Sequence, residues 1–230
     1  MSQPSKPKDL ARLIDHTLLR ADASLHDIEK LCAEARQQGF FSVCVNGSRV
    51  AQACALLEET EVKVCTVVGF PLGASDCDAK RYETEVAIDN GAAEIDVVIN
   101  IGKLKDGDDN FILRELRDVV EAADERLVKV IIETALLSND DKIRACHLIA
   151  ESGAKFVKTS TGFGPHGATV EDVRLLREAV GALFGVKASG GIRDTTMALA
   201  MVAAGATRLG TSASVAIVQG LPTDAGPSSY

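Results

Sequence analysis

The sequence lacks long apolar runs and an excess of basic residues, and each absence excludes a class of protein. No stretch approaches the roughly 20 apolar residues that a membrane-spanning helix needs. The polar segment Met1–Asp9 has none of the apolar stretch of a signal peptide. With a formal net charge of -8, the chain offers no clustered Lys and Arg in excess for a nucleic-acid interface. We therefore predict a cytoplasmic protein that binds neither a membrane nor nucleic acid.

Metal-binding spacings are also lacking. The six cysteines form no C-x-x-C pair, and the four histidines show neither H-x-H nor H-E-x-x-H spacing. Most of the cysteines lie inside apolar segments, where cysteine ordinarily remains a buried free thiol. We expect no metal ion and no other cofactor.

What the sequence does contain is an alternation of short β-branched runs with amphipathic stretches, which is typical of repeated βα units. Two of the runs are nearly continuous in hydrophobic residues, as expected for parallel strands that helices cover on both faces. The eight expected strands are Leu13–Thr17, Ser42–Asn46, Val64–Gly69, Glu94–Asn100, Val128–Glu133, Phe156–Thr159, Val186–Ser189 and Arg208–Gly210.

Four of the stretches between strands carry both a start and a stop signal for a helix. Each begins near a residue that can cap a helix N-terminus and ends before a glycine. The pairs are Ser24 with Gly39, Asn139 with Gly153, Thr169 with Gly181, and Asp194 with Gly205. The apolar face of the first helix is expected to comprise Leu25, Ile28, Leu31, Cys32 and Ala35.

Eight βα units in 230 residues fit a single α/β domain with the architecture of a small (β/α)8 TIM barrel, spanning residues 1–230. A doubly wound open sheet is the alternative, but the first βα turn lacks the G-x-G-x-x-G fingerprint of that fold. Residues 1–9 are expected to form a short N-terminal arm. Gly220–Tyr230, rich in Gly, Pro and Ser, is expected to form a flexible C-terminal tail.

Four charged residues fall in or at the ends of short apolar strands: Asp15, Asp96, Lys158 and Lys187. Such charges are costly to bury unless they are paired or used. In one interpretation they form ion pairs without chemistry, Asp96 with one lysine and Asp15 with the other. In the other, one ammonium lowers the pKa of a neighbouring amine, which can then attack a carbonyl. Asp96 would transfer the protons.

Small and hydroxyl residues follow the last three strands. Loops at this end of a (β/α)8 barrel often bind phosphate through backbone N–H groups and helix N-termini. Single glycines there are equally typical of ordinary turns, but their joint placement favours a phosphate site. The expected phosphate-binding residues are Thr161, Gly162, Gly190, Gly191, Gly210, Thr211 and Ser212.

Five motifs resemble the deoxyribose-phosphate aldolase family, and the resemblance extends over essentially the whole chain. They are Leu13-Ile-Asp-His-Thr, Glu94-Ile-Asp-Val-Val-Ile-Asn, Phe156-Val-Lys-Thr-Ser-Thr-Gly, Val186-Lys-Ala-Ser-Gly-Gly-Ile-Arg and the terminal Ser-Ser-Tyr. The resemblance implies a class I aldolase that reversibly cleaves 2-deoxy-D-ribose 5-phosphate to D-glyceraldehyde 3-phosphate and acetaldehyde. It implies that Lys158 forms the Schiff base, Lys187 perturbs the pKa of Lys158, Asp96 relays protons and Asp15 supports Asp96.

The resemblance assigns three further positions. Tyr230 would reach into the active site and assist proton transfer at the enamine carbon, and an extended tail from Gly220 can span up to roughly 35 Å. Phe163 stands where some family members carry a phosphate-holding lysine, so phosphate binding would depend more on backbone donors. Cys44 falls where some relatives place a cysteine near the substrate pocket, although an inert core thiol is the alternative.

Rival functions remain at this point. A phosphosugar isomerase or epimerase needs a carboxylate or histidine base and no imine-forming lysine. A phosphometabolite sensor needs no paired amines either, so the two strand lysines disfavour both. A transaldolase-like class I enzyme is the closest competitor, and substrate profiling would separate it. The expected partners are phosphosugar and aldehyde substrates, together with a second copy of the chain in a homodimer.

Overall fold

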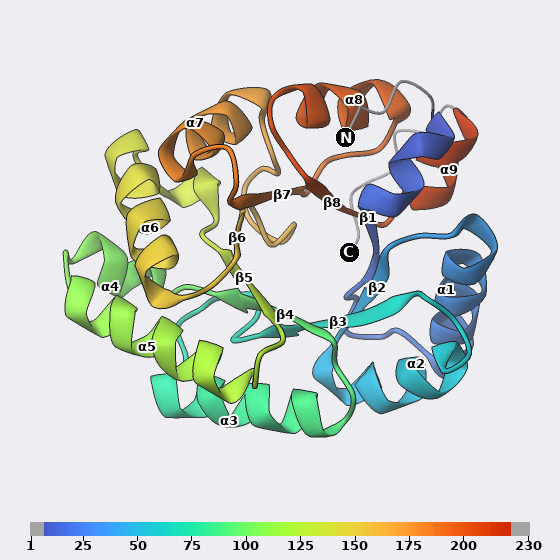
Figure 1. Cartoon of the computed structure of the whole chain (residues 1–230), viewed down its shortest axis with the longest axis horizontal. Helices are drawn as coiled ribbons and strands as arrows, with labels where there is room; N and C mark the ends of the chain where they lie inside the picture. Colours follow the sequence, from blue (N-terminus) through green and yellow to red (C-terminus); the bar gives the residue numbers. More distant parts are fainter. Residues whose placement is uncertain (1–6, 222–230) are drawn as a thin grey trace.

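A computed structural model describes residues 7–221 and shows eight parallel strands closed into a barrel in the order β1 to β8 (Figure 1). The strands are β1 Ile14–Leu18, β2 Ser42–Val45, β3 Lys63–Val68, β4 Glu94–Val98, β5 Leu127–Ile131, β6 Phe156–Lys158, β7 Gly185–Ser189 and β8 Arg208–Thr211. All eight expected strands are present, with ends that differ from the prediction by at most two residues. The predicted (β/α)8 barrel is therefore confirmed.

Helices surround the ring of strands (Figure 1). They are α1 Leu25–Gln38, α2 Val50–Leu57, α3 Cys77–Asp89, α4 Ile101–Lys105, α5 Asp109–Ala122, α6 Asn139–Ser152, α7 Val170–Val180, α8 Thr195–Ala203 and α9 Ser214–Gln219. Three short 3-10 segments, Pro7–Leu13, Gly47–Arg49 and Thr134–Leu136, complete the regular structure of the described residues. No helix within residues 7–221 is both long and apolar enough to cross a membrane.

The helix ends follow the signals in the sequence. Ser24 and Asp27 form a reciprocal capping box at the start of α1, and Gly39 ends α1 in the left-handed conformation. The predicted bounds of α6, Asn139 and Gly153, are confirmed, and its cap is Ser138, whose hydroxyl accepts the Asp141 N–H. One detail of the prediction for α1 was wrong. Leu25 is 53% exposed, so the buried face of α1 begins at Ile28 instead.

Two apolar clusters flank the strands. The larger lies between the strands and the helices, because alternate side chains such as Val43 and Val45 point outward from the barrel. The smaller consists of Leu19, Cys44, Cys65 and Val67 with Phe70 packed against them. All six cysteines are free thiols, as predicted, and only Cys54 is not fully buried.

The ends of the chain are described in part. The expected N-terminal arm includes residues 7–9, which begin the 3-10 segment Pro7–Leu13, and Leu10 in that segment is buried. Gly220, expected to begin the tail, instead closes α9 in the left-handed conformation. Residues 1–6 and 222–230, and with them Tyr230, lie outside the described residues.

Candidate active site

Asp96 on β4 lies at the centre of a charged cluster inside the barrel. Its Oδ2 atom is 2.8 Å from the Nζ atom of Lys158 and 2.7 Å from that of Lys187. Its Oδ1 atom is 2.8 Å from the Nζ atom of Lys129. Four neighbouring strands, β4 to β7, each supply one of these side chains, and all four are buried. The structure thus brings together three residues that the sequence had singled out separately.

Asp15 on β1 joins the same cluster through Lys187. Its Oδ2 atom is 2.5 Å from Lys187 Nζ, and its Oδ1 atom accepts hydrogen bonds from Ser42 and Arg208 at 2.7 and 2.8 Å. Lys187 therefore bridges both aspartates. Both ion pairs considered from the sequence are present, Asp96 with Lys158 and Asp15 with Lys187, but they are not separate, because Lys187 also contacts Asp96.

Sequence reasoning missed four members of the network: Lys129, Glu94, Arg208 and Cys65. Lys129 Nζ is 2.6 Å from Glu94 Oε2, and Arg208 reaches the same oxygen at 3.1 Å. A signal for two of them was present. Glu94 precedes Asp96 by two residues and therefore faces the same side of β4, and Lys129 interrupts an apolar strand as Lys158 does.

Contacts within the cluster stabilise the ionised forms of its two aspartates and of Lys187. Burial alone would raise the pKa of Asp96, but the ammonium groups of Lys129, Lys158 and Lys187 outweigh it and hold that pKa well below its usual range. The pKa of Asp15 is also lowered, because Lys187 and Arg208 outweigh the effect of burial. Conversely, burial would lower the pKa of Lys187, but the two aspartates raise it above the ordinary lysine value. Lys187 is therefore an ammonium beside Lys158.

The interior carries one more cation than carboxylate among these residues. The cations are Lys129, Lys158, Lys187 and Arg208, and the carboxylates are Asp15, Glu94 and Asp96. Excess buried charge is costly, so loss of one proton from the cluster brings it to neutrality. Lys158 contacts one carboxylate, whereas Lys129 and Lys187 each contact two.

The loops after β6 and β7 pack closely at the mouth of the barrel. A Cβ atom on Gly167 would lie 2.1 Å from the carbonyl oxygen of Gly190, so only glycine fits at this contact. The Ala168 N–H donates to the carbonyls of Ser189 and Gly190, each at 3.0 Å. The two glycine-bearing loops of the expected phosphate site therefore form one surface, although they are far apart in sequence.

The expected phosphate ligands differ in their accessibility. Gly191 and Ser212 are exposed, whereas the hydroxyl of Thr211 is buried and donates to the Ile192 carbonyl at 2.6 Å. Thr161 donates both its N–H and its hydroxyl to one carboxylate oxygen of Glu133. A phosphate could use the Thr161 donors only after Glu133 had released them.

Phe163 lies over this mouth, where its ring meets that of Phe70 edge-on with centroids 5.4 Å apart. It is 49% exposed and lines a cavity of about 210 Å³ with Glu133 and apolar residues of the loops after β3, β4 and β5. The lining is Pro71, Leu72, Ile101, Glu133, Leu136, Thr161, Phe163 and Gly164. This side of the mouth offers mainly carbon atoms and a carboxylate, and a carboxylate repels a phosphate.

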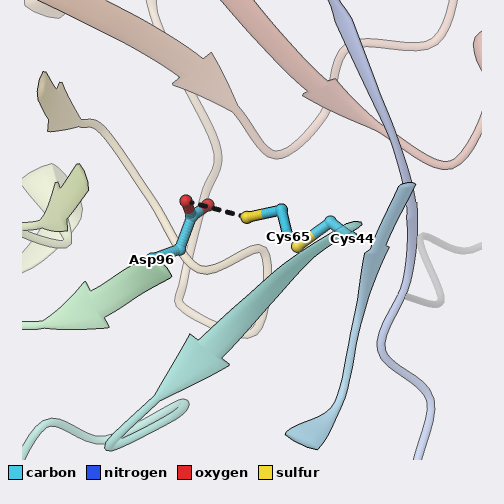
Figure 2. A group of neighbouring side chains, drawn as sticks. All are labelled: Cys44, Cys65 and Asp96. Atoms are coloured by element: carbon cyan, nitrogen blue, oxygen red, sulfur yellow. Dashed lines mark hydrogen bonds between the residues drawn. The ribbon is translucent and has the colours of Figure 1, made fainter. Parts of the chain in front are cut away.

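Cys44 and Cys65 point toward Asp96 from β2 and β3 (Figure 2). The thiol of Cys65 donates to Asp96 Oδ1 at 3.2 Å, and the candidate ligand atoms of the three residues lie within 4.8 Å of one another. They could contact a metal ion by distance alone. A divalent cation there would, however, compete for Asp96 with three ammonium groups that already bind it.

Comparisons with known proteins identify the family of this chain. Residues 10–221 match the model of the DeoC/LacD family aldolase. Deoxyribose-phosphate aldolase of Geobacillus sp. strain WCH70 is 58% identical over 213 residues, covering 92% of this chain and 96% of the relative. The same-named protein of Alkaliphilus oremlandii is 60% identical over 211 residues, covering 91% and 95%. A tetrameric deoxyribose phosphate aldolase structure from Aeropyrum pernix superposes with a TM-score of 0.87 at 34% identity, covering 93% and 91%.

Proposed function

Because this chain belongs to the DeoC/LacD family of aldolases, we propose that it cleaves 2-deoxy-D-ribose 5-phosphate through a Schiff base on Lys158. The products are D-glyceraldehyde 3-phosphate and acetaldehyde, and the reaction is reversible. The observation that carries this proposal is the pair of buried lysines, Lys158 and Lys187, on a single oxygen of Asp96. A structural ion pair would need only one amine, whereas an imine-forming site needs a neutral amine with a charged neighbour.

Lys158 has the position expected of the nucleophile. Its side chain is 3% exposed, whereas those of Lys129 and Lys187 are fully buried, and it contacts one carboxylate where each of these two lysines contacts two. Its amine would attack C1 of the open-chain sugar to give a carbinolamine, which loses water to form an iminium. A base removes the proton of the C3 hydroxyl, the C2–C3 bond breaks and its electrons pass to the iminium. This step releases D-glyceraldehyde 3-phosphate and leaves an enamine on Lys158. Protonation of the enamine and hydrolysis then release acetaldehyde.

Asp96 is proposed as the group that moves protons in these steps. One of its oxygens lies within hydrogen-bond distance of both Lys158 and Lys187, so it can exchange a proton with the nascent carbinolamine and have it restored through Lys187. Asp15 would hold Lys187 in place from the other side. Tyr230 would protonate the enamine carbon, as the resemblance implies, and this assignment stays a prediction.

The phosphate would bind on the β7 and β8 side of the mouth. Gly190, Gly191, Gly210 and Ser212 are proposed to supply backbone and hydroxyl donors there. Thr161, Gly162 and Thr211 complete the proposed set, with the Thr161 donors now held by Glu133. Binding energy at this remote group would orient the reacting carbons over Lys158.

Two broader expectations accompany the proposal. We propose a homodimer, and light scattering on a size-exclusion column would test it against the tetramer seen in the Aeropyrum pernix relative. The cytoplasmic location stays a prediction.

Reductive trapping tests the proposed function. Acetaldehyde and borohydride should add one ethyl group to the peptide that contains Lys158, because the iminium is reduced where it forms. Lys158→Met should show neither the modification nor aldol cleavage. Labelling of Lys187 in place of Lys158 would reverse the two roles. Cleavage rates with fructose-type phosphosugars would separate a transaldolase-like enzyme from the proposed one.

A further inference from the structure

Two cysteines on neighbouring strands face each other in the barrel interior. Cys44 on β2 and Cys65 on β3 are direct partners in the strand register, and both are completely buried. Their sulfur atoms lie within 4.8 Å of each other (Figure 2). Adjacent strands are about 4.8 Å apart, which falls in the range of roughly 4.4–6.8 Å between the Cα atoms of a disulfide. The backbone therefore permits a bond between the two sulfurs.

We propose that Cys44 and Cys65 form an oxidation site for hydroperoxides, in which Cys44 reacts first and Cys65 closes a disulfide beside Asp96. The mechanism of aldol cleavage uses neither thiol. The pairing of the two thiols is independent of the proposed function, whereas the access of peroxide to them and the effect on turnover rest on it.

The chemistry needs two steps and one equivalent of peroxide. The thiolate of Cys44 attacks one oxygen of hydrogen peroxide, the O–O bond breaks, and hydroxide leaves to take up a proton as water. Cys44 is then a sulfenic acid. The sulfur of Cys65 attacks the Cys44 sulfur, the S–O bond breaks, and a second water leaves with the Cys65 proton. Two thiols have lost two electrons, and one peroxide has been reduced to two waters.

The surroundings distinguish the attacking thiol from the resolving one. The neighbouring Cys65 thiol and the ammonium groups of Lys187 and Lys158 lower the pKa of Cys44 despite burial and the opposing charge of Asp96. Burial, Cys44 and the carboxylate of Asp96 raise the pKa of Cys65, with Lys129 opposing. The Cys65 thiol also donates its proton to Asp96 Oδ1 at 3.2 Å, and a carboxylate in contact disfavours a thiolate there. Thiolate is the reactive form, so Cys44 is the nucleophile that attacks first.

Reagent access follows from the position of the thiols. An aldehyde substrate has to reach Lys158, and Asp96 is in contact with both Lys158 and Cys65. Hydrogen peroxide is no larger than acetaldehyde, so any path by which the proposed substrate reaches Lys158 would also admit peroxide. A ligand held on Lys158 should slow the oxidation of the thiols.

Disulfide formation would alter the catalytic cluster. The Cys65 thiol donates to Asp96 Oδ1 at 3.2 Å and lies 3.4 Å from Lys129 Nζ, and a disulfide sulfur has no proton to donate. We expect turnover to fall severalfold and to return on reduction.

Mass mapping of the full chain provides the test. The chain is treated with hydrogen peroxide, its remaining thiols are alkylated in denaturant, and the unreduced digest is analysed. A peptide pair joined through Cys44 and Cys65 should appear, about 2 Da lighter than the sum of the two thiol peptides. Cys54→Ser removes the most accessible cysteine and should leave this cross-link unchanged. Cys65→Ser should give no cross-link and should leave Cys44 as a sulfenic acid that dimedone traps.

Other outcomes would overturn the proposal. A wild-type chain that forms dimedone-labelled Cys44 but never the linked pair would show that Cys65 does not resolve it. Oxidation confined to Cys54 would show that peroxide does not enter the barrel. A fully cross-linked enzyme with unchanged turnover would show that the bond does not disturb Asp96. Borohydride trapping on Lys158 is read separately, so a failure of the aldolase assignment would not be mistaken for a failure of the thiol site.

Discussion

At the residue scale, one carboxylate organises the interior of the barrel. Asp96 accepts from three lysines on three strands, and Cys65 adds a thiol donor. A buried carboxylate of this kind cannot be removed without leaving several ammonium groups close together in a medium of low polarity. The same carboxylate therefore holds the ammonium groups in place and, in the proposed mechanism, transfers protons.

Asp96→Asn should reduce both turnover and stability. The amide cannot relay protons, and loss of such a group typically slows a reaction by about 10²–10⁴-fold. Loss of one partner of a buried ion pair typically costs about 3–5 kcal/mol of unfolding free energy. Steady-state kinetics and urea unfolding measure the two effects. A variant with normal stability and normal turnover would show that the cluster is neither charged nor catalytic in the way described.

Ser212→Glu should discriminate between phosphorylated and free sugars. Ser212 is exposed beside the loop after β8, and a carboxylate there would repel a phosphate. We expect kcat/KM for 2-deoxyribose 5-phosphate to fall by about 10-fold or more, with much less change for 2-deoxyribose. Ala203→Glu, which adds the same charge at the far end of α8, serves as control. Equal losses with both sugars would place the phosphate elsewhere.

At the scale of elements, a buried ion pair connects the end of β4 to helices α3 and α5. Lys80 on α3 donates to the Val98 carbonyl at 2.8 Å and to Glu115 on α5 at 2.7 Å. The other oxygen of Glu115 accepts the N–H of Asn100 at 3.0 Å. Burial lowers the pKa of Lys80 and raises that of Glu115, although each partner opposes the shift of the other. The strand that carries Asp96 is thus held from outside the barrel.

Lys80→Met should destabilise the protein, because it leaves Glu115 buried without its cation. The expected loss of unfolding free energy is about 3–5 kcal/mol, measured by urea unfolding. Adding Glu115→Gln should restore much of it, since the amide oxygen can still accept the Asn100 N–H and no charge remains. A double variant as unstable as the single one would show that packing of the lysine chain, and not the orphaned carboxylate, accounts for the loss.

At the scale of the whole molecule, the buried carboxylates should govern stability in acid. The pKa values of Asp15 and Asp96 are lower in the folded chain than the ordinary value near 3.9, so the unfolded chain binds more protons. The contribution of these two carboxylates to the free energy of unfolding is complete at pH values above about 3.9. It is lost progressively as the pH falls below it toward the lowered folded values.

Asp15→Asn should make the unfolding free energy depend less steeply on pH in acid. Each such carboxyl adds about 1.4 kcal/mol per pH unit to the slope of unfolding free energy, so the slope between roughly pH 4 and pH 2 should fall by about that amount. Urea unfolding at a series of pH values measures it. An unchanged slope would mean that Asp15 titrates alike in the folded and unfolded chain, contrary to its contacts with Lys187 and Arg208.

The sequence by itself determined the eight strands, the ends of several helices and the catalytic candidates on β1, β4, β6 and β7. These features are readable because they depend on local chemistry: β-branched runs form strands, Ser24 and Gly39 set the ends of α1, and a lysine in an apolar strand is conspicuous. Only the tertiary structure decided that Lys129 shares Asp96 with Lys158 and Lys187, that Cys44 meets Cys65, and that Glu133 holds Thr161. Each of these contacts depends on strand register and barrel closure, which fix the relative heights of residues far apart in the chain and leave no trace in local spacing.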